Sequence, residues 1–286
     1  MDINRYKITG ESGAELSGFP EKCLACNVTK KELRAAMREN KEKISELQDK
    51  LYAEGKVGVL IIFQAMDAAG KDSAIKHVMS GVNPQGVNVH SFKQPSKEEL
   101  AHDYLWRAVK VLPERGKIAI FNRSYYEDVL VVKVHKLYKN YVMPDRCKDE
   151  ETIEKRYKQI RDFEDYLWEN GIITVKFFLH LSKQEQRKRF LKRIDRKDKN
   201  WKFSEADLKE REYWDEYQEA YQAAISNTAT ERNPWYIVPA DRKDYTRAVI
   251  SEVLLDVMGA IDPKYPEVSE QQEADLLECK RQLGEE

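Results

Sequence analysis

The sequence predicts a three-layer α/β/α sandwich built around a parallel sheet of five strands. Short apolar stretches alternate with longer amphipathic stretches along most of the 286 residues, the order expected of repeated strand–helix units. The first short stretch, VGVLIIF at 57–63, is apolar without interruption, as a central strand covered on both faces must be. A glycine-containing loop follows this strand directly and leads into a helix that begins at Lys71.

The elements are predicted from these patterns in chain order. A helix over 29–54 has apolar residues near a 3.6-residue spacing, and Ser96 with Glu99 forms a capping box for a helix over 96–112. We expect strands at 57–63, 87–92, 116–121, 172–181 and 235–238. We expect the other helices from 71, over 124–137 and 150–168, from 182, over 205–225 and 241–258, and one loosely held helix after 267.

The domain organisation follows from the same reading. Residues 1–28 contain several glycines and are predicted to form an irregular arm that lies on the rest of the protein. Residues 29–286 are predicted to form a single domain, in which about 182–204 act as a helical lid. In sheets of this kind ligands bind at the carboxyl ends of the strands, so the residues after Phe63 and Phe121 are the first candidates for a site.

The composition excludes several classes of protein. Aromatic residues make up 10% of the chain, which argues against disorder, and the net charge of −1 leaves any anion site to local clusters of lysine and arginine. No apolar stretch approaches the about 18 residues of a membrane-spanning helix, and no secretion signal is evident, so we expect a cytoplasmic protein. Cys23 and Cys26 form a lone C-x-x-C without a second pair or nearby histidines, which argues against a zinc site.

The segment QAMDAAGKDS at 64–73 is similar to a phosphate-binding loop between a strand and a helix, so the fold is predicted to be P-loop kinase-like. Backbone N–H groups at the start of the helix would face an anion, and the lysine would add its charge. We therefore expect phosphate to contact Ala68, Ala69, Gly70, Lys71, Asp72 and Ser73. Ala65 and Asp72 depart from the standard pattern, which has glycine and serine or threonine at these positions.

Asp67 lies inside this loop, where a carboxylate would repel phosphate unless a cation lies between them. It either holds Mg²⁺ and orients an attacking phosphate oxygen, or caps the turn. The end of the next apolar strand, IAIFNRSYYE at 118–127, supplies Asn122 as a weak metal ligand and Arg123 as a phosphate clamp. Glu127 either replaces a missing metal-binding carboxylate or completes a capping box with Ser124.

Positive charge is concentrated between residues 182 and 202. Ten lysines and arginines there face three acidic residues, which gives a local charge of +7 in a nearly neutral chain. Arg189 and Arg193 are four residues apart, on one helix face, and could reach one phosphate chain together. The segment is predicted to be a lid that closes over the site, although a solvated charged helix remains an alternative. Nucleic-acid binding is a further alternative, with Trp201 and Phe203 as stacking faces.

These stretches together resemble the polyphosphate kinase 2 family, and within it the subgroup called class III. The resemblance runs from about residue 30 to 258 and is carried by FQAMDAAGKD (63–72), SGVNPQG (80–86), SFKQPSKEELAHDYLWR (91–107), LPERGKIAIFNRSYYEDVLVVKVH (112–135), KRFLKRID and KNWKFS (188–204), YWDEYQEAY (213–221) and NPWYIVPAD (233–241). Asn122, where other subgroups have aspartate, is similar to the class III pattern. Lys133 and the Arg196-Lys197 pair depart from the family pattern.

The resemblance implies an enzyme that transfers the terminal phosphoryl group of inorganic polyphosphate to AMP and ADP, with Mg²⁺ or Mn²⁺ as cofactor. It implies that the catalytic residues are Asp67, Lys71, Asn122, Arg123 and Glu127, and that the metal is held by Asp67, Asn122 and Glu127. Nucleotide binding is implied for Asp67, Arg123, Tyr126, Glu127 and Arg189, and polyphosphate binding for the loop residues with Lys133, Arg189 and Arg193.

The resemblance also implies a homo-oligomer, a dimer or a tetramer, with no nucleic-acid or membrane partner. Two other functions are left open by the residues alone. One is an ATP-dependent nucleoside monophosphate kinase, and the other is a non-catalytic P-loop module that binds polyanions or nucleic acid.

Overall fold

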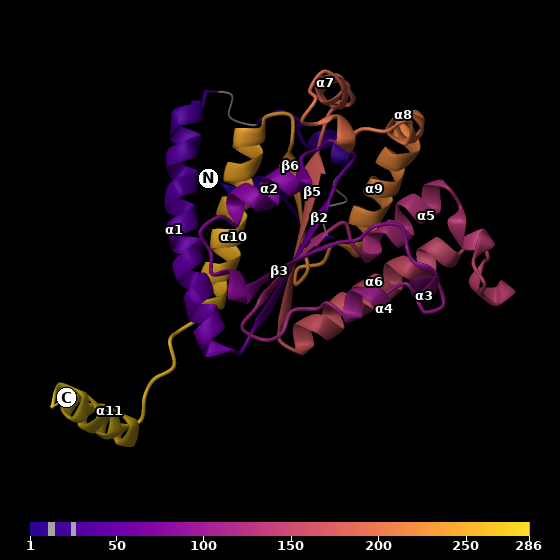
Figure 1. Ribbon diagram of the computed structural model, residues 1–286. Helices are drawn as coiled ribbons and strands as arrows, with labels where there is room; N and C mark the ends of the chain where they lie inside the picture. The colour runs from indigo at the N-terminus through magenta and orange to yellow at the C-terminus, as the bar shows by residue number, and fades with distance from the viewer. Residues whose placement is uncertain (11–14, 24–26, 286) are drawn as a thin grey trace.

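The computed structural model describes residues 1–10, 15–23 and 27–285, and its core is a six-stranded sheet between two layers of helices (Figure 1). Cys26 lies outside the described residues, so the expectation about the C-x-x-C pair is not tested. The strands are β1 (Lys7–Ile8), β2 (Gly58–Gln64), β3 (Val87–Ser91), β4 (Ile118–Asn122), β5 (Ile172–His180) and β6 (Trp235–Pro239). They lie in the order β1-β6-β5-β2-β4-β3.

Strand β2 lies at the centre of the sheet and pairs in parallel with β4 on one side and β5 on the other. All seven of its residues are buried, which explains why its sequence is apolar throughout rather than alternating. The register places Phe63 opposite Asn122 and Gln64 opposite Phe178. The loop after β2 and the polar residues at the end of β4 therefore meet at one edge of the sheet, as the sequence predicted.

The sheet has six strands and not the predicted five. The additional strand, β1, comes from the N-terminal arm and pairs with β6, and this pairing is antiparallel, whereas the others are parallel. Lys7 lies opposite Tyr236 and Ile8 opposite Trp235. A strand of two residues has no recognisable period in a sequence, and it forms here because β6 would otherwise leave an unpaired edge.

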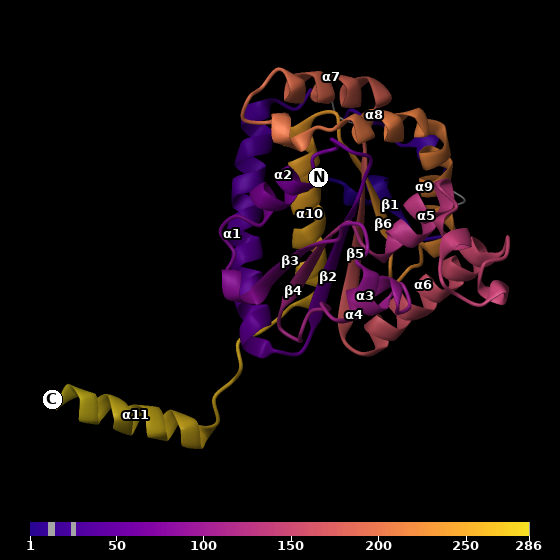
Figure 2. The ribbon, with the colours of Figure 1, turned by 45° about the vertical axis from the view of Figure 1, so that its right-hand side comes forward.

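The helices form one layer on each face of the sheet (Figures 1 and 2). The α-helices are α1 (Lys30–Glu54), α2 (Lys71–Val78), α3 (Lys97–Leu100), α4 (Trp106–Val109), α5 (Val131–Val134), α6 (Thr152–Glu169), α7 (Lys183–Ile194), α8 (Glu205–Glu212), α9 (Trp214–Thr228), α10 (Lys243–Ile261) and α11 (Glu270–Gly284). Apolar residues of α1, α2 and α10 bury one face of the sheet, and those of α6 and α9 bury the other. The three-layer prediction is confirmed.

Three predicted helices are shorter or interrupted. The capping box at Ser96 and Glu99 is present, but its helix ends at Leu100, and α4 begins only at Trp106. The segment 124–137 contains the 3₁₀ helix η4 (Tyr125–Val129) and the short α5 instead of one helix. The predicted helix over 205–225 is two helices, α8 and α9. Amphipathic spacing over these stretches did not reveal the breaks, because each short piece still buries an apolar face.

A buried ion pair joins the sheet to the helices on one face. Lys176 on β5 and Glu164 on α6 are both fully buried, and Nζ lies 2.6 Å from the Glu164 Oε2. The same ammonium group donates to the Thr228 carbonyl and the Tyr126 hydroxyl, while the hydroxyl of Tyr125 donates to Glu164. Burial of both charges is tolerated because these hydrogen bonds satisfy them.

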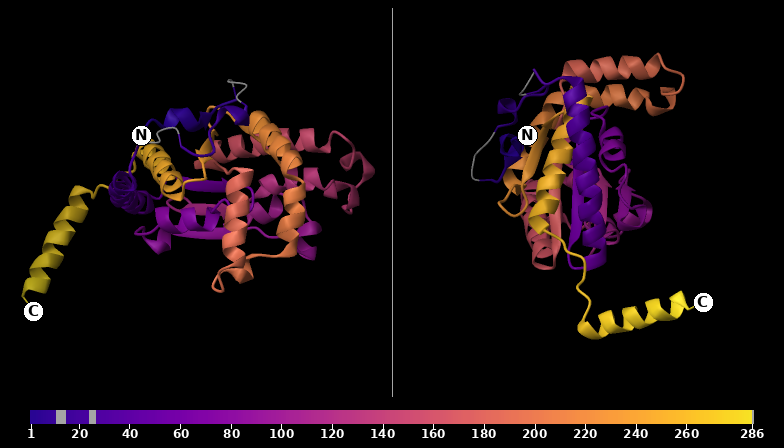
Figure 3. Two further views of the ribbon diagram at one scale, coloured as in Figure 1. Left: turned by 90° about the horizontal axis from the view of Figure 1, so that it is seen from above. Right: turned by 90° about the vertical axis from the view of Figure 1, so that its left-hand side faces the viewer.

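The segment predicted to be a lid, residues 182–204, lies above the carboxyl ends of the strands and is called the lid below. Helices α7 and α8 run side by side across this edge in Figures 2 and 3. Helix α11 projects away from the rest of the structure, and three of its leucines are well exposed (Figure 3). No helix in the described part of the chain is both long and apolar enough to cross a bilayer.

Candidate active site

The loop between β2 and α2 is shaped to expose backbone N–H groups. Ala68 and Gly70 both have positive φ angles, of 64° and 106°, so the chain reverses sharply before the helix. Gly70 is the N-cap residue of α2 and has no side chain with which to cap the first N–H groups. An L-residue at φ 106° would be strained, which accounts for glycine at this position. Residues 67–73 line a cavity, as predicted for a phosphate-binding loop.

Arg189 on α7 holds this loop from the lid side. Its Nη1 donates to the carbonyls of Ala68 and Ala69, at 3.0 and 2.7 Å, and its Nη2 donates to the carbonyls of Ala240 and Asp241. Its Nε donates to Glu185 at 2.9 Å. A guanidinium group has five N–H donors, so every donor has a protein acceptor. Arg189, which the resemblance assigns to the substrates, is 7% exposed and bound to the backbone of the loop.

Lys71 folds back on the loop that precedes it. Its Nζ donates to the Ala65 carbonyl at 2.9 Å, and its side chain is buried against the cavity wall. Burial, followed by the charge of Arg123, lowers the pKa of Lys71 to about 8, although Asp67 and Glu127 act in the opposite direction. An anion in the cavity would favour the charged form, because it would compensate the buried ammonium group.

Three of the predicted residues form a charged cluster at the edge of the sheet where the parallel strands have their carboxyl ends. The Arg123 Nη2 lies 2.8 Å from Asp67 Oδ1, and its Nη1 lies 3.8 Å from Glu127 Oε2. Arg123 has a positive φ of 65°, and its backbone N–H donates to the Phe63 carbonyl, which turns the side chain toward the β2 loop. The carboxylate of Glu127, more than that of Asp67, raises the pKa of Arg123 against the effect of burial.

Asp72 connects three elements at the mouth of the cavity. Its Oδ1 accepts a hydrogen bond from the Asn122 side-chain amide, and its Oδ2 accepts one from Lys202, both at 2.9 Å. Partial burial raises the pKa of Asp72, but these two hydrogen bonds outweigh it and the net shift is downward. The residue that departs from the standard loop pattern therefore links α2 to the end of β4 and to the lid.

The largest cavity near the loop, here called the phosphate cavity, has a volume of about 690 Å³. Ten lysines and arginines line it against three aspartates, counted among the described residues. The lining includes Asp67, Lys71, Asp72, Lys93, Asn122, Arg123, Arg189, Lys192, Arg193, Arg196, Lys199, Trp201, Lys202, Asp207 and Lys243. Cations on the loop, β4, α7 and α10 thus face one space, which is the arrangement expected for a polyanion.

A smaller cavity of about 270 Å³, here called the side cavity, adjoins the phosphate cavity. Asp67, Arg123 and Asp207 line both, so the two cavities meet at the Arg123–Asp67 ion pair. The remaining lining of the side cavity includes Met66, Glu127, Val131, Gln186, Glu210, Arg211, Tyr217 and Tyr221. Four carboxylates and two arginines line the side cavity, so Arg123, which faces both cavities, is one of only two cations among the described residues that an anion there could contact.

Two of the predicted site residues do not line these cavities. Tyr126 is fully buried, and its hydroxyl is bound to Glu164 and Thr228 in the interior. Lys133 donates to the hydroxyl of Tyr157 instead of facing the loop. Glu127 is not part of a capping box, because the Ser124 hydroxyl accepts the Tyr126 N–H of a 3₁₀ turn and the Glu127 carboxylate faces Arg123.

Several lining residues were not identified from the sequence. Lys93 follows β3, Lys243 begins α10, and Asp207 with Glu210 lies on α8. In the sequence, each of these residues is one charge among many and belongs to no recognisable motif. Only the order of the strands in the sheet brings their segments together at the carboxyl edge. The rule that ligands bind beyond the carboxyl ends of parallel strands could have indicated Lys93, because it directly follows a strand.

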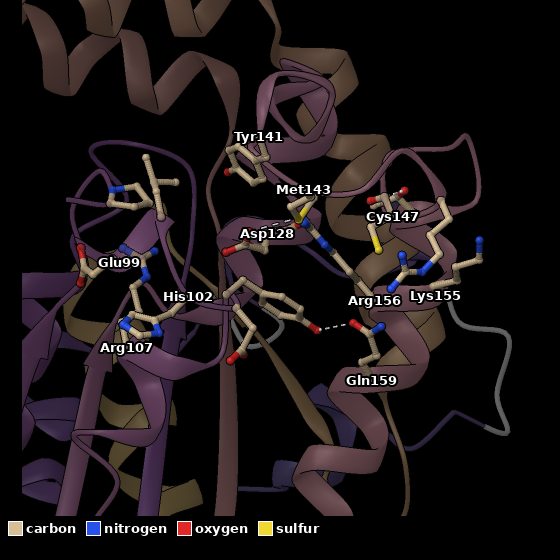
Figure 4. A pocket seen from close by; sticks show the side chains of 16 residues that line it. Glu99, His102, Arg107, Asp128, Tyr141, Met143, Cys147, Lys155, Arg156 and Gln159 are labelled. Atoms are coloured by element: carbon tan, nitrogen blue, oxygen red, sulfur yellow. Dashed lines mark hydrogen bonds and ion pairs between the residues drawn. The ribbon is translucent and has the colours of Figure 1, made fainter. Parts of the chain in front are cut away.

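A third cavity, of about 320 Å³, lies on the flank of the sheet between α3, α4 and α6 (Figure 4). Arg156 pairs there with Asp128 at 3.3 Å and lies over the ring of Tyr104. Burial raises the pKa of Asp128 to about 6 despite the neighbouring Arg156. Arg107 lines this cavity and donates to the carbonyl of Lys93, which lines the phosphate cavity, and the two cavities share no lining residue.

Known proteins with related sequences share most of this chain. A family model described as polyphosphate kinase 2 matches residues 27–266. An ADP-polyphosphate phosphotransferase from Rhodopseudomonas palustris is 47% identical over 285 residues, which are 99% of each chain. An AMP/ADP-polyphosphate phosphotransferase from Meiothermus ruber is 42% identical over 277 residues, 96% of this chain and 100% of the relative.

The fold agrees with the sequence comparison. The crystal structure of polyphosphate kinase 2 from Arthrobacter aurescens TC1 superimposes with a TM-score of 0.86 at 38% identity, covering 96% of this chain and 95% of that one. This chain belongs to the polyphosphate kinase 2 family, whose members are polyphosphate-dependent phosphotransferases.

Proposed function

We propose that this chain transfers the terminal phosphoryl group of inorganic polyphosphate to AMP and to ADP. The observation that carries the proposal is the junction of two cavities at Arg123 and Asp67, one of them lined mainly by cations. Polyphosphate lies in the phosphate cavity, and the terminal phosphate of the nucleotide enters the side cavity. The names of the two relatives described above support this choice of substrates.

The transfer needs no covalent bond to the protein. An oxygen of the nucleotide's terminal phosphate forms a bond to the terminal phosphorus of the polymer. The bond from that phosphorus to its bridging oxygen breaks, and the polymer leaves one unit shorter as an anion. Arg123 lies between the two substrates and stabilises the charge that develops on the transferring group. Asp67 holds the Arg123 side chain in this position and needs no role as a strong base, because the attacking group is already ionised.

The residues also fit a divalent cation. Asp67, Asn122 and Glu127 offer oxygen atoms at the junction, the ligand type that Mg²⁺ and Mn²⁺ prefer. Among the described residues there is no group of three His, Cys, Asp or Glu suited to a metal. This agrees with a site in which phosphates and water complete the coordination, as is usual for Mg²⁺ in phosphoryl transfer. A bound ion would reduce the repulsion between the two anionic substrates.

The experiment is a comparison of phosphoryl donors. The protein is incubated with Mg²⁺, AMP and either long-chain polyphosphate or ATP, and the nucleotides are separated by chromatography. We expect ADP and then ATP with polyphosphate. Product from AMP with ATP as donor, but none with polyphosphate as donor, would identify an ATP-dependent nucleoside monophosphate kinase and overturn the proposal. Polyanion binding without any transfer would instead indicate a non-catalytic module.

A further inference from the structure

Two basic grooves run along the first turns of α1. The first, of about 470 Å³, lies between α1, α2 and α10 and is lined by Lys30, Leu33, Arg34, Met37, His77, Lys243, Asp244 and Arg247. The second, of about 660 Å³, is lined by Lys30, Lys31, Arg34, Ala35, Arg38, Glu39 and Glu42. The two grooves adjoin, because Lys30 and Arg34 line both.

The first groove borders the phosphate cavity. Lys243 lines both spaces. Arg247 lines the groove, and its Nη2 donates to the hydroxyl of Ser73 in the phosphate loop at 2.6 Å. Helices α1 and α10 both begin at the edge of the sheet where α7 lies (Figure 1). Cations therefore continue from the phosphate cavity over α10 to α1. We call Lys30, Arg34, Arg38, Lys243 and Arg247 the basic track.

Apart from Glu42, the acidic residues beside the basic track are already engaged. Glu32 accepts the Thr29 N–H in the α1 capping box, Asp244 pairs with Arg242, and Glu39 pairs with Lys43. No ion pair within the described residues involves Lys30, Arg34 or Arg38, and all three are exposed. Burial lowers the pKa of Lys243, and so do the nearby cations Arg189 and Lys192. Six lysines and arginines line the two grooves against three acidic residues, so the track keeps an excess of positive charge.

The arrangement suits a flexible polyanion without bases. Lys30, Arg34 and Arg38 are four residues apart, so their side chains lie on one face of α1 with roughly 6 Å between neighbours. Proteins that bind single-stranded nucleic acid combine such charges with aromatic stacking faces. Among the described residues that line the two grooves there is no Phe, Tyr or Trp.

We propose that the basic track binds the part of a long polyphosphate chain that extends beyond the phosphate cavity. The inference rests on the proposed function and adds a chain-length preference to it. A short donor fills the phosphate cavity alone, whereas a long donor also contacts α1. Long chains then bind more tightly per molecule and stay bound between successive transfers, because the polymer can advance by one unit after each transfer while other units keep contact with the track.

The test compares two donors on one variant. Lys30→Gln, Arg34→Gln and Arg38→Gln are combined, and KM and kcat are measured with tetrapolyphosphate and with long-chain polyphosphate at fixed AMP. Three exposed contacts, at about twofold each, predict a roughly 10-fold rise in KM for the long chain. We expect kcat for both donors, and KM for tetrapolyphosphate, to stay within twofold of the wild type.

The matched control is Lys50→Gln with Lys56→Gln and Lys117→Gln, which removes the same charge near the other end of α1, from lysines whose acidic partners line neither groove. An equal KM change in the control, or no change for the long chain in the track variant, overturns the proposal. Failure of the wild type with both donors would instead refute the proposed function. In that case the track is tested by filter binding of labelled long-chain polyphosphate, and a single-stranded oligonucleotide that competes equally well would overturn it.

Discussion

The bonds of Arg189 predict that this residue positions the phosphate loop and does not bind phosphate directly. Arg189→Ala removes hydrogen bonds to four backbone carbonyls and one carboxylate in a buried environment. At about 1 kcal/mol for each carbonyl, the loss of stability is about 4 kcal/mol, within the range for breaking a buried charged contact. With roughly 2.1 cal/mol/K of unfolding entropy per residue over 286 residues, this lowers Tm by about 7 °C.

Differential scanning calorimetry and steady-state kinetics together test this reasoning. Arg189→Ala should lower Tm and kcat together, because the loop carbonyls lose the group that turns them away from the cavity. Arg189→Lys keeps the charge but has fewer hydrogen-bond donors, so its Tm should lie between that of the wild type and that of Arg189→Ala. Arg193→Ala is the control. Arg193 makes one bond of 3.3 Å to the Lys202 carbonyl, so its loss should raise KM for polyphosphate at nearly unchanged Tm. A wild-type Tm for Arg189→Ala, with only KM for polyphosphate raised, would show that Arg189 is a substrate ligand.

Three further predictions concern the reaction centre and the core. Arg123→Ala should lower kcat on the order of 10³-fold with little change in KM, measured by nucleotide chromatography; a loss of only a few fold would place Arg123 away from the transferring group. Because the folded-state pKa of Lys71 lies near 8, below its ordinary value, kcat/KM for polyphosphate should fall as pH rises through about 8. Lys71→Arg, which stays charged, should lack that alkaline decline, and a decline that persists in the variant would assign it to another group. Lys176→Ala should destabilise the protein by about 4 kcal/mol in calorimetry, because it leaves Glu164 buried and unpaired. Adding Glu164→Leu should restore much of the loss, and an equally unstable double variant would contradict the explanation.

The sequence was sufficient for the parts of the site that are continuous in the chain. The loop from Asp67 to Ser73 and the strand end at Asn122 and Arg123 each lie at one strand–helix junction, and parallel pairing brings them together. The positions of these residues along the chain were enough to identify them, because parallel pairing of β2 with β4 places the carboxyl ends of the two strands side by side. The antiparallel β1 was missed because it depends on an edge created by β6, far along the chain.

The sequence pattern did not determine the direction in which each side chain of the site points. The resemblance placed Tyr126 and Lys133 in the site, but the chain there turns through η4 and α5 and directs both side chains elsewhere. Arg189 was predicted to bind the substrates, and the structure places it against the loop instead. Its partners are backbone carbonyls, which have no sequence signature.

The contact between Asp72 and Lys202 sets how freely the polymer can enter. Asp72 is 66% exposed and Lys202 32%, so this ion pair is worth at most about 1 kcal/mol, or roughly a fivefold bias. Such a bias favours the paired state but leaves Lys202 unpaired for an appreciable fraction of the time. The encounter rate with substrate is therefore expected to depend on diffusion and ionic strength, with the ion pair slowing it only modestly.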